Sequence, residues 1–282
     1  MRSNNYAYVN GEFVPEAQAA VSIYDSGFLF GDGVFETMPV YSRRIFRFEQ
    51  HVQRLFRGLD RLKIEIPFSI AGLQGVFQKL CEHDVTDGIA RVYVTRGPGA
   101  VVLSTKSPTQ PTVVAIAWPR PANPPEDLRA IVSSVRVNHE SSLTQIKSAN
   151  RLPYVLAKQE ASGAGADEAL LLNQAGHVAE FSAYNLFAVI NDRLFTPPVS
   201  DGALPGVTRE AVLQLAERLK IPANEWSIKA ADLVDASEIF ATNSTRGIVP
   251  IVGLNKSLDQ QRKVTSRLQE AYQVLVREEL GL

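Results

Sequence analysis

Two residues near the middle of the chain have types and surroundings that could support covalent chemistry. Lys147 stands immediately before "SANRLP", a run of small and turn-forming residues that could open a helix. A lysine at such a junction can reach into a cleft, where a depressed pKa lets its amine form a Schiff base with a carbonyl group. Taken alone, Lys147 fits a solvated surface lysine better.

The second residue is Glu180, in "GHVAEFSAYNLFAV", where apolar residues flank the acid on both sides. A carboxylate between apolar strand segments costs free energy unless it is paired. It therefore either points to solvent or meets a positive partner, and both interpretations stay open at this point.

Three further segments could bind an anion. In "LPGVTREAVL", Gly206 lets the backbone come close, and the N–H groups of Val207 and Thr208 then lie at a helix N-terminus. Arg54, in the helical pattern 48–62, could complete a phosphate site, although it also fits a solvated helix face. The polar turn in "FATNSTRGIVP" could add hydroxyl and N–H donors from Asn243, Ser244 and Thr245, although alone it resembles an ordinary turn.

The elements that must position these residues fall into two segments. Before residue 120, a hairpin turning at Asn10-Gly11 and a hairpin turning near Ser42-Arg43 precede helices predicted at 48–62 and 70–83. The β-branched runs "IARVYVTRG" and "PTVVAIAW" follow as strands.

A proline-rich stretch, "PRPANPPEDLR", suits neither a helix nor a central strand, so we place a domain boundary there, with domains at 1–120 and 121–282. In the second segment, the residue pattern predicts helices at 150–163, 207–219 and 259–280, with strands at 131–137, 168–172, 178–181, 185–190, 193–196, 225–228, 237–242 and 248–252.

The predicted helices and strands follow one another without strict alternation. This order favours an α+β fold, or a barrel-like sheet with helices outside, over a doubly wound parallel sheet.

Composition excludes several classes of function. The 282 residues are 45% hydrophobic and 21% charged with a formal net charge of -1, which gives no general attraction to nucleic acid or anionic lipid. One cysteine, Cys81, allows no intrachain disulfide, and four scattered histidines predict no metal site. The sequence has no run of 18 apolar residues and no apolar signal core, so we expect a cytoplasmic protein without a membrane span.

The order of these segments resembles the fold-type IV (class IV) family of pyridoxal-phosphate enzymes, which includes branched-chain aminotransferases, D-amino acid aminotransferases and aminodeoxychorismate lyase. The resemblance spans nearly the whole chain, through "YVNGEFVP", "DSGFLFGDGVFET", "HVQRL", "RVYVTRG", "IKSANRLPYVLAKQEASGAGADEALLLN", "GHVAEFSAYNLFAV", "LFTPP", "LPGVTREAVL" and "EIFATNSTRGIVPI". It implies a two-domain fold, with a smaller N-terminal α/β domain and a larger barrel-like C-terminal domain that binds pyridoxal 5'-phosphate and carries the Schiff-base lysine. It also implies a homodimer.

The resemblance implies a role for each candidate residue. Lys147 matches the lysine that holds the cofactor, and Glu180 matches the acid that contacts the pyridine nitrogen and keeps it protonated. The cofactor phosphate would be bound by Arg54, the backbone of Val207 and Thr208, and the hydroxyl of Ser244, while Leu204 would pack on the ring face. The substrate pocket would include Phe30, Phe35, Thr37, Arg91, Asn243 and Thr245.

Motifs within the family point to two reactions. "KSANRLP", Thr37 in "FET" and "TNSTRGIVP" resemble the lyase, which releases pyruvate from aminodeoxychorismate to give 4-aminobenzoate. The continuation "TRGPGAVVLST" departs from the lyase, and "GAGADEALLLN" suits transaminases generally. We predict an aminotransferase acting on an amino acid or amine and a 2-oxo acid, with the lyase as the alternative.

A non-catalytic binding protein of the same fold is a further alternative, against which the joint presence of Lys147, Glu180 and Arg54 argues. An ATP- or NAD-dependent enzyme would need a phosphate-binding loop, and neither G-x-x-x-x-G-K-[ST] nor G-x-G-x-x-G occurs in the sequence.

Overall fold

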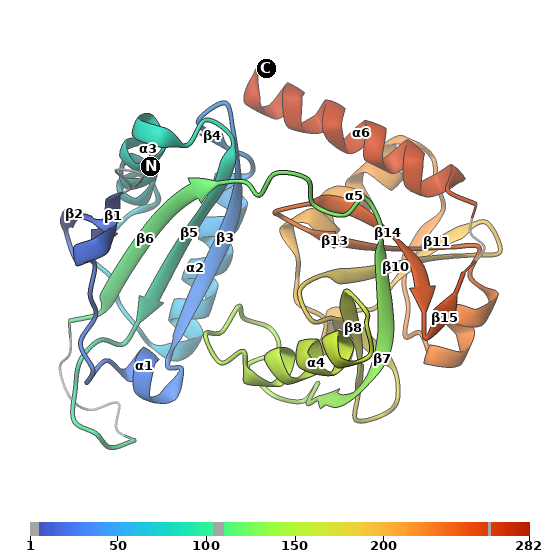
Figure 1. Cartoon of the computed structure of the whole chain (residues 1–282), viewed down its shortest axis with the longest axis horizontal. Helices are drawn as coiled ribbons and strands as arrows, with labels where there is room; N and C mark the ends of the chain where they lie inside the picture. Colours follow the sequence, from blue (N-terminus) through green and yellow to red (C-terminus); the bar gives the residue numbers. More distant parts are fainter. Residues whose placement is uncertain (1–5, 104–109, 259–260) are drawn as a thin grey trace. The chain divides into compact units, whose positions relative to one another are not determined.

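The computed structural model describes residues 6–103, 110–258 and 261–282, which form two compact units. Unit 1 comprises Met1–Ala122, Ile146–Asn150 and Glu279–Leu282, and unit 2 comprises Asn123–Gln145 and Arg151–Glu278. Each unit has its own sheet and is described by itself below (Figure 1).

Unit 1 is built on one antiparallel sheet in the order β2-β1-β6-β5-β3-β4. Its strands are β1 (Tyr6–Val9), β2 (Glu12–Pro15), β3 (Gly33–Tyr41), β4 (Arg44–Ile45), β5 (Gly88–Thr95) and β6 (Thr112–Pro119). Its helices are η1 (Glu16–Gln18), α1 (Ser26–Phe30), α2 (Phe48–Leu62) and α3 (Ile70–Asp84), of which α2 and α3 cover one face of the sheet (Figure 1).

Local sequence explains these elements. Asn10 and Gly11 both adopt positive φ, as a two-residue hairpin turn requires, so the predicted turn is confirmed. Helix α2 buries Val52, Leu55 and Leu59, the helically spaced apolar residues that predicted it.

Alternation along β3 gives the sheet of unit 1 two chemically different faces. Val34 and Met38 belong to the hydrophobic core under the helices, and Glu36 lies between them in the strand and meets side chains of α2. Successive side chains of a strand point to opposite faces, so Phe35 and Thr37 occupy the other face.

The segment Ile146–Asn150 extends this sheet at β3. The Phe35 N–H donates to the Lys147 carbonyl at 3.0 Å, and the Ala149 N–H donates to the Gly33 carbonyl at 2.9 Å. Lys147 therefore lies in unit 1, although it follows the proline-rich stretch and the sequence grouped it with the C-terminal domain.

Unit 2 contains a nine-stranded sheet in the order β12-β11-β10-β13-β14-β7-β8-β9, with β15 paired to β14. The strands are β7 (Leu128–Val137), β8 (Glu168–Asn173), β9 (Val178–Phe181), β10 (Asn185–Ile190), β11 (Arg193–Thr196), β12 (Ala223–Glu225), β13 (Glu238–Asn243), β14 (Gly247–Leu254) and β15 (Lys256–Ser257). The helices are α4 (Leu152–Gly163), η2 (Val199–Asp201), α5 (Val207–Arg218), η3 (Ala230–Asp235) and α6 (Lys263–Leu280), of which α6 belongs to this unit up to Glu278.

The sheet of unit 2 curls on itself. Strand β9 ends the sheet order, yet the short turn 182–184 brings it back beside β10, and the Phe181 N–H donates to the Tyr184 carbonyl at 2.8 Å. The predicted α+β class with a barrel-like larger sheet is confirmed.

The predicted strand 225–228 is wrong, because the strand runs from Ala223 to Glu225. Its partner β11 ends at Thr196, and the next two residues are prolines, which have no N–H to continue the ladder.

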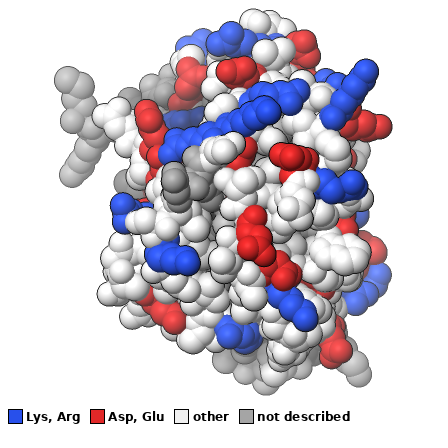
Figure 2. Space-filling model, turned by 90° about the vertical axis from the view of Figure 1, so that its right-hand side faces the viewer, with Lys and Arg blue, Asp and Glu red and all other residues white. Residues whose placement is uncertain are grey.

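On the face drawn in Figure 2, basic and acidic side chains are interspersed. Among the described residues, no helix has the length and apolar character that a bilayer crossing demands.

Candidate active site

Lys147 lies beside an aromatic side chain in unit 1. Its Nζ is 4.8 Å from the centroid of the Phe35 ring, which lies in the neighbouring β3 strand. The ammonium is also close enough to His51 to disfavour a charge there. Burial is the main cause that lowers the pKa of His51, and Lys147 and Arg54 act in the same direction against the raising effect of Glu36.

Three of the predicted pocket residues meet on one face of the unit 1 sheet. Thr37 and Arg91 are cross-strand partners, and the Arg91 Nε donates to the Thr37 hydroxyl at 2.9 Å. The Arg91 guanidinium lies 5.6 Å from the Phe35 ring centroid. Phe30, another predicted pocket residue, ends α1 and is 39% exposed.

Two aromatic residues that the sequence analysis missed complete this face. Tyr93 stacks on Phe35 with a centroid distance of 5.2 Å and accepts a hydrogen bond from Arg91 at 3.2 Å. Trp118 lies 5.5 Å from the Arg91 guanidinium. Alternation in "ARVYVT" and "AIAWP" could have placed both residues on the face opposite the core.

Arg54 forms a buried ion pair on the helix side of the same sheet. Its Nε and Nη2 donate to the two Glu36 oxygens at 2.6 and 2.7 Å, and His51 Nδ1 lies 2.7 Å from Glu36 Oε2. Burial alone would raise the pKa of Glu36, but Arg54 and His51 outweigh it and lower that pKa to about 2. A guanidinium has five N–H donors, so pairing with Glu36 is compatible with binding an anion as well.

Glu180 is almost fully buried in unit 2 and accepts several hydrogen bonds. The Leu204 N–H donates to its Oε2 at 2.9 Å, and the Asn185 amide lies 3.3 Å from the same oxygen. Burial is the main cause that raises the pKa of the nearby Tyr154, and the charge of Glu180 raises it further. Glu180 is therefore a fixed acceptor, and the possibility that it points to solvent is excluded.

The start of α5 has the geometry of an anion site. Gly206 is the N-cap, and Val207 and Thr208 open the helix with buried side chains. The first N–H groups of a helix have no intrahelical partner and carry the positive end of the dipole. A Cβ at Gly206 would lie 2.0 Å from Asn185 Oδ1, so glycine is required where the chain passes this amide.

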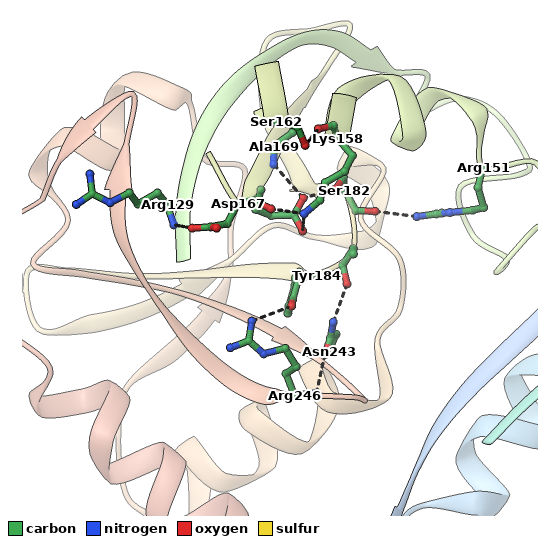
Figure 3. Close-up of polar contacts among 12 residues, drawn as sticks. Arg129, Arg151, Lys158, Ser162, Asp167, Ala169, Ser182, Tyr184, Asn243 and Arg246 are labelled. Carbon is green, nitrogen blue, oxygen red and sulfur yellow. Dashed lines mark hydrogen bonds and ion pairs between the residues drawn. The ribbon is translucent and has the colours of Figure 1, made fainter. Parts of the chain in front are cut away.

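The turn after β13 is shaped by its own asparagine. Asn243 Oδ1 accepts from the Arg246 N–H at 2.9 Å (Figure 3) and from the Thr245 N–H at 3.1 Å. The Asn243 amide donates to the Ala183 carbonyl at 3.2 Å. Ser244 lies inside this turn. Asn243 thus holds the loop to the 182–184 turn, which follows Glu180 in the chain.

Two further residues that the sequence analysis missed contact predicted site residues of other elements. Asn185 of β10 donates to Glu180 of β9, and Glu36 of β3 pairs with Arg54 of α2. Among the residues described in the structure, no group of three or more His, Cys, Asp or Glu side chains could hold a metal ion.

Comparison with known proteins decides the family. The family model described as "Amino-transferase class IV" matches residues 33–254. The chain belongs to the class IV aminotransferase family. The predicted family is therefore confirmed, and this class IV chain is an enzyme of the aminotransferase type.

Similar proteins carry related names. The chain is 38% identical over 271 residues, 94% of both proteins, to the "Putative branched-chain-amino-acid aminotransferase" of Methanocaldococcus jannaschii. It is 31% identical to a D-alanine aminotransferase of Bacillus licheniformis over 248 residues, 87% of each. The Escherichia coli branched-chain amino acid aminotransferase structure superimposes with a TM-score of 0.92 at 27% identity, covering 97% of this chain and 95% of that one.

Proposed function

We propose that this class IV aminotransferase uses pyridoxal 5'-phosphate to move an amino group between an amino acid and a 2-oxo acid. The observation that carries the proposal is the position of the Lys147 amine. Backbone hydrogen bonds to β3 hold its segment so that the amine lies over the Phe35 ring, on the sheet face that also carries Arg91. A solved T.th. branched-chain amino acid aminotransferase with a TM-score of 0.90 and 28% identity, covering 97% of this chain and 94% of that one, contains pyridoxamine 5'-phosphate.

The chemistry of the available donors fits each part of this cofactor. An aldehyde needs an amine, for which Lys147 is the candidate. A pyridine nitrogen needs a buried carboxylate, for which Glu180 is the candidate, held by the Leu204 N–H. A phosphate needs a helix N-terminus and charged donors, for which the candidates are Arg54, Val207, Thr208 and Ser244.

When bound, pyridoxal phosphate supplies the carbonyl that takes up an amino group and a ring that withdraws electrons from the substrate α-carbon. Lys147 would hold the cofactor through its amine and, as a free amine, would move the proton at the substrate α-carbon. Glu180 would be the carboxylate that keeps a proton at the ring nitrogen. Leu204 positions Glu180 through its backbone N–H, in addition to packing on the ring as the resemblance implies.

We assign substrate binding to the face of the unit 1 sheet that carries Phe35 and Arg91. Arg91 is half-buried among Phe35, Tyr93 and Trp118, and its guanidinium provides the charge that a substrate carboxylate needs. The aromatic rings around it favour an amino acid with an apolar side chain. Thr37 fixes Arg91 by accepting a hydrogen bond from its Nε.

We further propose a cytoplasmic homodimer, as the family resemblance implies. Helix α4 carries Leu152, Val155 and Leu156 at helical spacing, and each side chain is about half exposed or more. An apolar stripe of this kind is a candidate contact surface for a second copy of the chain. A molar mass of one chain by light scattering, across the micromolar range, would reject the dimer.

Covalent labelling tests the cofactor assignment. The protein is loaded with pyridoxal phosphate, reduced with borohydride and digested, and the labelled peptide is mapped. We expect the label on Lys147, and Lys158, which also lies on the 147–163 segment, serves as the internal comparison. Label on Lys158 or any other lysine would refute the assignment of Lys147 as the cofactor lysine. A colourless protein that takes up no cofactor would instead support a non-catalytic binding protein.

A half-reaction separates the aminotransferase from the lyase. A panel of L- and D-amino acids is added without an acceptor, and visible absorption follows conversion of the cofactor to its aminated form. An aminotransferase converts the cofactor to its aminated form. It then needs a 2-oxo acid such as pyruvate or 2-oxoglutarate to restore the aldehyde form. Pyruvate release from aminodeoxychorismate without an acceptor, with no conversion by any amino acid, would instead identify the lyase.

A further inference from the structure

The side chain of Asn185, the first residue of β10, joins Glu180 to Leu204. The Asn185 amide nitrogen donates to Glu180 Oε2 at 3.3 Å and to the Leu204 carbonyl at 2.9 Å. The Leu204 N–H donates to the same Glu180 oxygen at 2.9 Å. These three hydrogen bonds close a ring that fixes the carboxylate against both β10 and the segment before α5. Asn185 and Glu180 are 6% and 4% exposed, so water competes little for the bonds.

The partners of Asn185 allow its amide only one orientation. A carboxylate and a carbonyl are both acceptors, so only the NH₂ group can face Glu180 and Leu204, and each receives one of its two hydrogens. The amide oxygen lies against Gly206, where a Cβ would be 2.0 Å from Asn185 Oδ1. One side chain therefore contacts both the Glu180 carboxylate and Gly206, the N-cap of α5.

These contacts connect two parts of the proposed cofactor site. Glu180 is the acid proposed for the pyridine nitrogen, and the first N–H groups of α5 are proposed for the phosphate. The ring nitrogen and the phosphate belong to one molecule. The acid and the start of α5 must therefore keep a fixed separation if both are to bind it.

The turn between Glu180 and Asn185 is fixed by other hydrogen bonds. Arg151 Nη2 donates to the Ser182 carbonyl at 3.1 Å, as Figure 3 shows, and the Ser182 N–H donates to the Ala169 carbonyl at 2.9 Å. Loss of the Asn185 amide would leave these bonds in place. It would remove support only from the carboxylate and from the segment before α5.

We propose that Asn185 is a positioning residue, which holds the Glu180 carboxylate and the start of α5 at the separation that the cofactor requires. A donor to a carboxylate also stabilises its ionised form, so Asn185 helps to keep the proton on the ring nitrogen instead of on the acid. The assignment rests on the proposed function, because it concerns the acid proposed to face the ring.

The test is a double-mutant cycle between Asn185→Ala and Glu180→Gln. Each protein is loaded with pyridoxal phosphate that carries ¹⁵N at the ring nitrogen. The two readouts are the ¹⁵N resonance and the rate of the half-reaction with an amino acid that converts the wild type. A role through Glu180 makes the two changes non-additive, whereas a general effect on the fold is the same with and without Glu180→Gln.

The matched control is Asn173→Ala. Asn173 is fully buried at the end of β8, and its amide donates to the Asp201 carbonyl at 3.2 Å. Its oxygen accepts from the N–H groups of Ala175 and His177, both at 3.0 Å. The control therefore removes a buried amide of the same sheet whose bonds go to the backbone and not to Glu180.

In Asn185→Ala we expect the half-reaction to slow about tenfold, the factor that one hydrogen bond to a charged group contributes. The ring nitrogen resonance should move toward the unprotonated position. When Glu180→Gln is already present, Asn185→Ala should slow the reaction less than about threefold and should not move the resonance further. Asn173→Ala should keep the wild-type resonance and act equally in both backgrounds. If Asn185→Ala does not fold, Asn185→Ser, a smaller truncation, replaces it in the cycle.

Two results would overturn the assignment. If Asn185→Ala keeps the wild-type resonance and changes the rate by the same factor in both backgrounds, Asn185 has no positioning role, although the proposed function stands. If the wild-type protein takes up no labelled cofactor, the proposed function fails, and the role of Asn185 fails with it.

Discussion

The replacement of Glu36 by glutamine tests the electrostatics of unit 1 most directly. Glu36 is fully buried and accepts hydrogen bonds from Arg54 at 2.6 and 2.7 Å, with His51 at 2.7 Å. Glu36→Gln keeps the shape of the side chain but leaves the Arg54 charge buried without its counter-ion. Removing one partner of a buried ion pair costs roughly 3–5 kcal/mol.

The pKa of Glu36 gives a second route to the same magnitude. A decrease from its ordinary value of 4.5 to about 2 corresponds to about 3 kcal/mol of preference for the ionised form in the folded state. Domains are typically stable by only about 5–15 kcal/mol, so this loss would be a large part of the total.

The sign of the pH dependence follows from the lowered pKa. Because the folded-state pKa lies below the unfolded value, the contribution of the carboxylate is present above about pH 4.5 and is lost as the pH falls toward about 2. The stability difference between the wild type and Glu36→Gln should therefore be constant near neutral pH and shrink across that acidic window.

The assay is guanidinium unfolding of the protein without cofactor, followed by circular dichroism at several pH values. The matched control is Glu49→Gln, an exposed glutamate in the first turn of α2, which should change the free energy of unfolding by less than about 0.5 kcal/mol. If Glu36→Gln falls within about 1 kcal/mol of the wild type at pH 7, the ion pair does not hold α2 on the sheet and the reasoning is wrong.

Three further outcomes are expected. Glu180→Gln should lower transamination by orders of magnitude while cofactor binding largely survives, and a variant with near-normal turnover would contradict the proposed role. Gly206→Ala places a Cβ 2.0 Å from Asn185 Oδ1, so it should weaken cofactor binding at least tenfold, as measured by fluorescence titration. The control is Gly75→Ala, in open space on α3, which should leave cofactor binding unchanged and stabilise the fold by about 0.5–1 kcal/mol. Arg91→Ala should raise KM for carboxylate substrates more than it lowers kcat, and an unchanged KM would exclude Arg91 from substrate binding.

Local rules let the sequence predict much of the fold. Helix α2 follows from the spacing of Val52, Leu55 and Leu59, and the first hairpin follows from Asn10-Gly11. These features depend on residues within a few positions of each other, so one strand or one helical turn contains the needed information. The family resemblance likewise came from ordered local segments.

Only the tertiary structure decided which side chains meet. From the sequence, Arg54 was predicted to be a phosphate ligand. In the folded protein it also pairs with Glu36, 18 positions earlier, on the core side of β3. The sequence showed Glu180 only as a lone acid, whereas folding brings the Asn185 amide of β10 and the Leu204 N–H, from the segment before α5, to its carboxylate.

The position of Lys147 has the same cause. Its segment lies beyond the proline-rich stretch in sequence, yet backbone hydrogen bonds to β3 place it in unit 1. Hydrogen bonds between strands depend on which edges meet and in which register, and a strand edge accepts many sequences because its donors and acceptors are backbone groups. The residues around Lys147 indicated its chemistry from the sequence. The backbone hydrogen bonds between its segment and β3 determine where its amine lies.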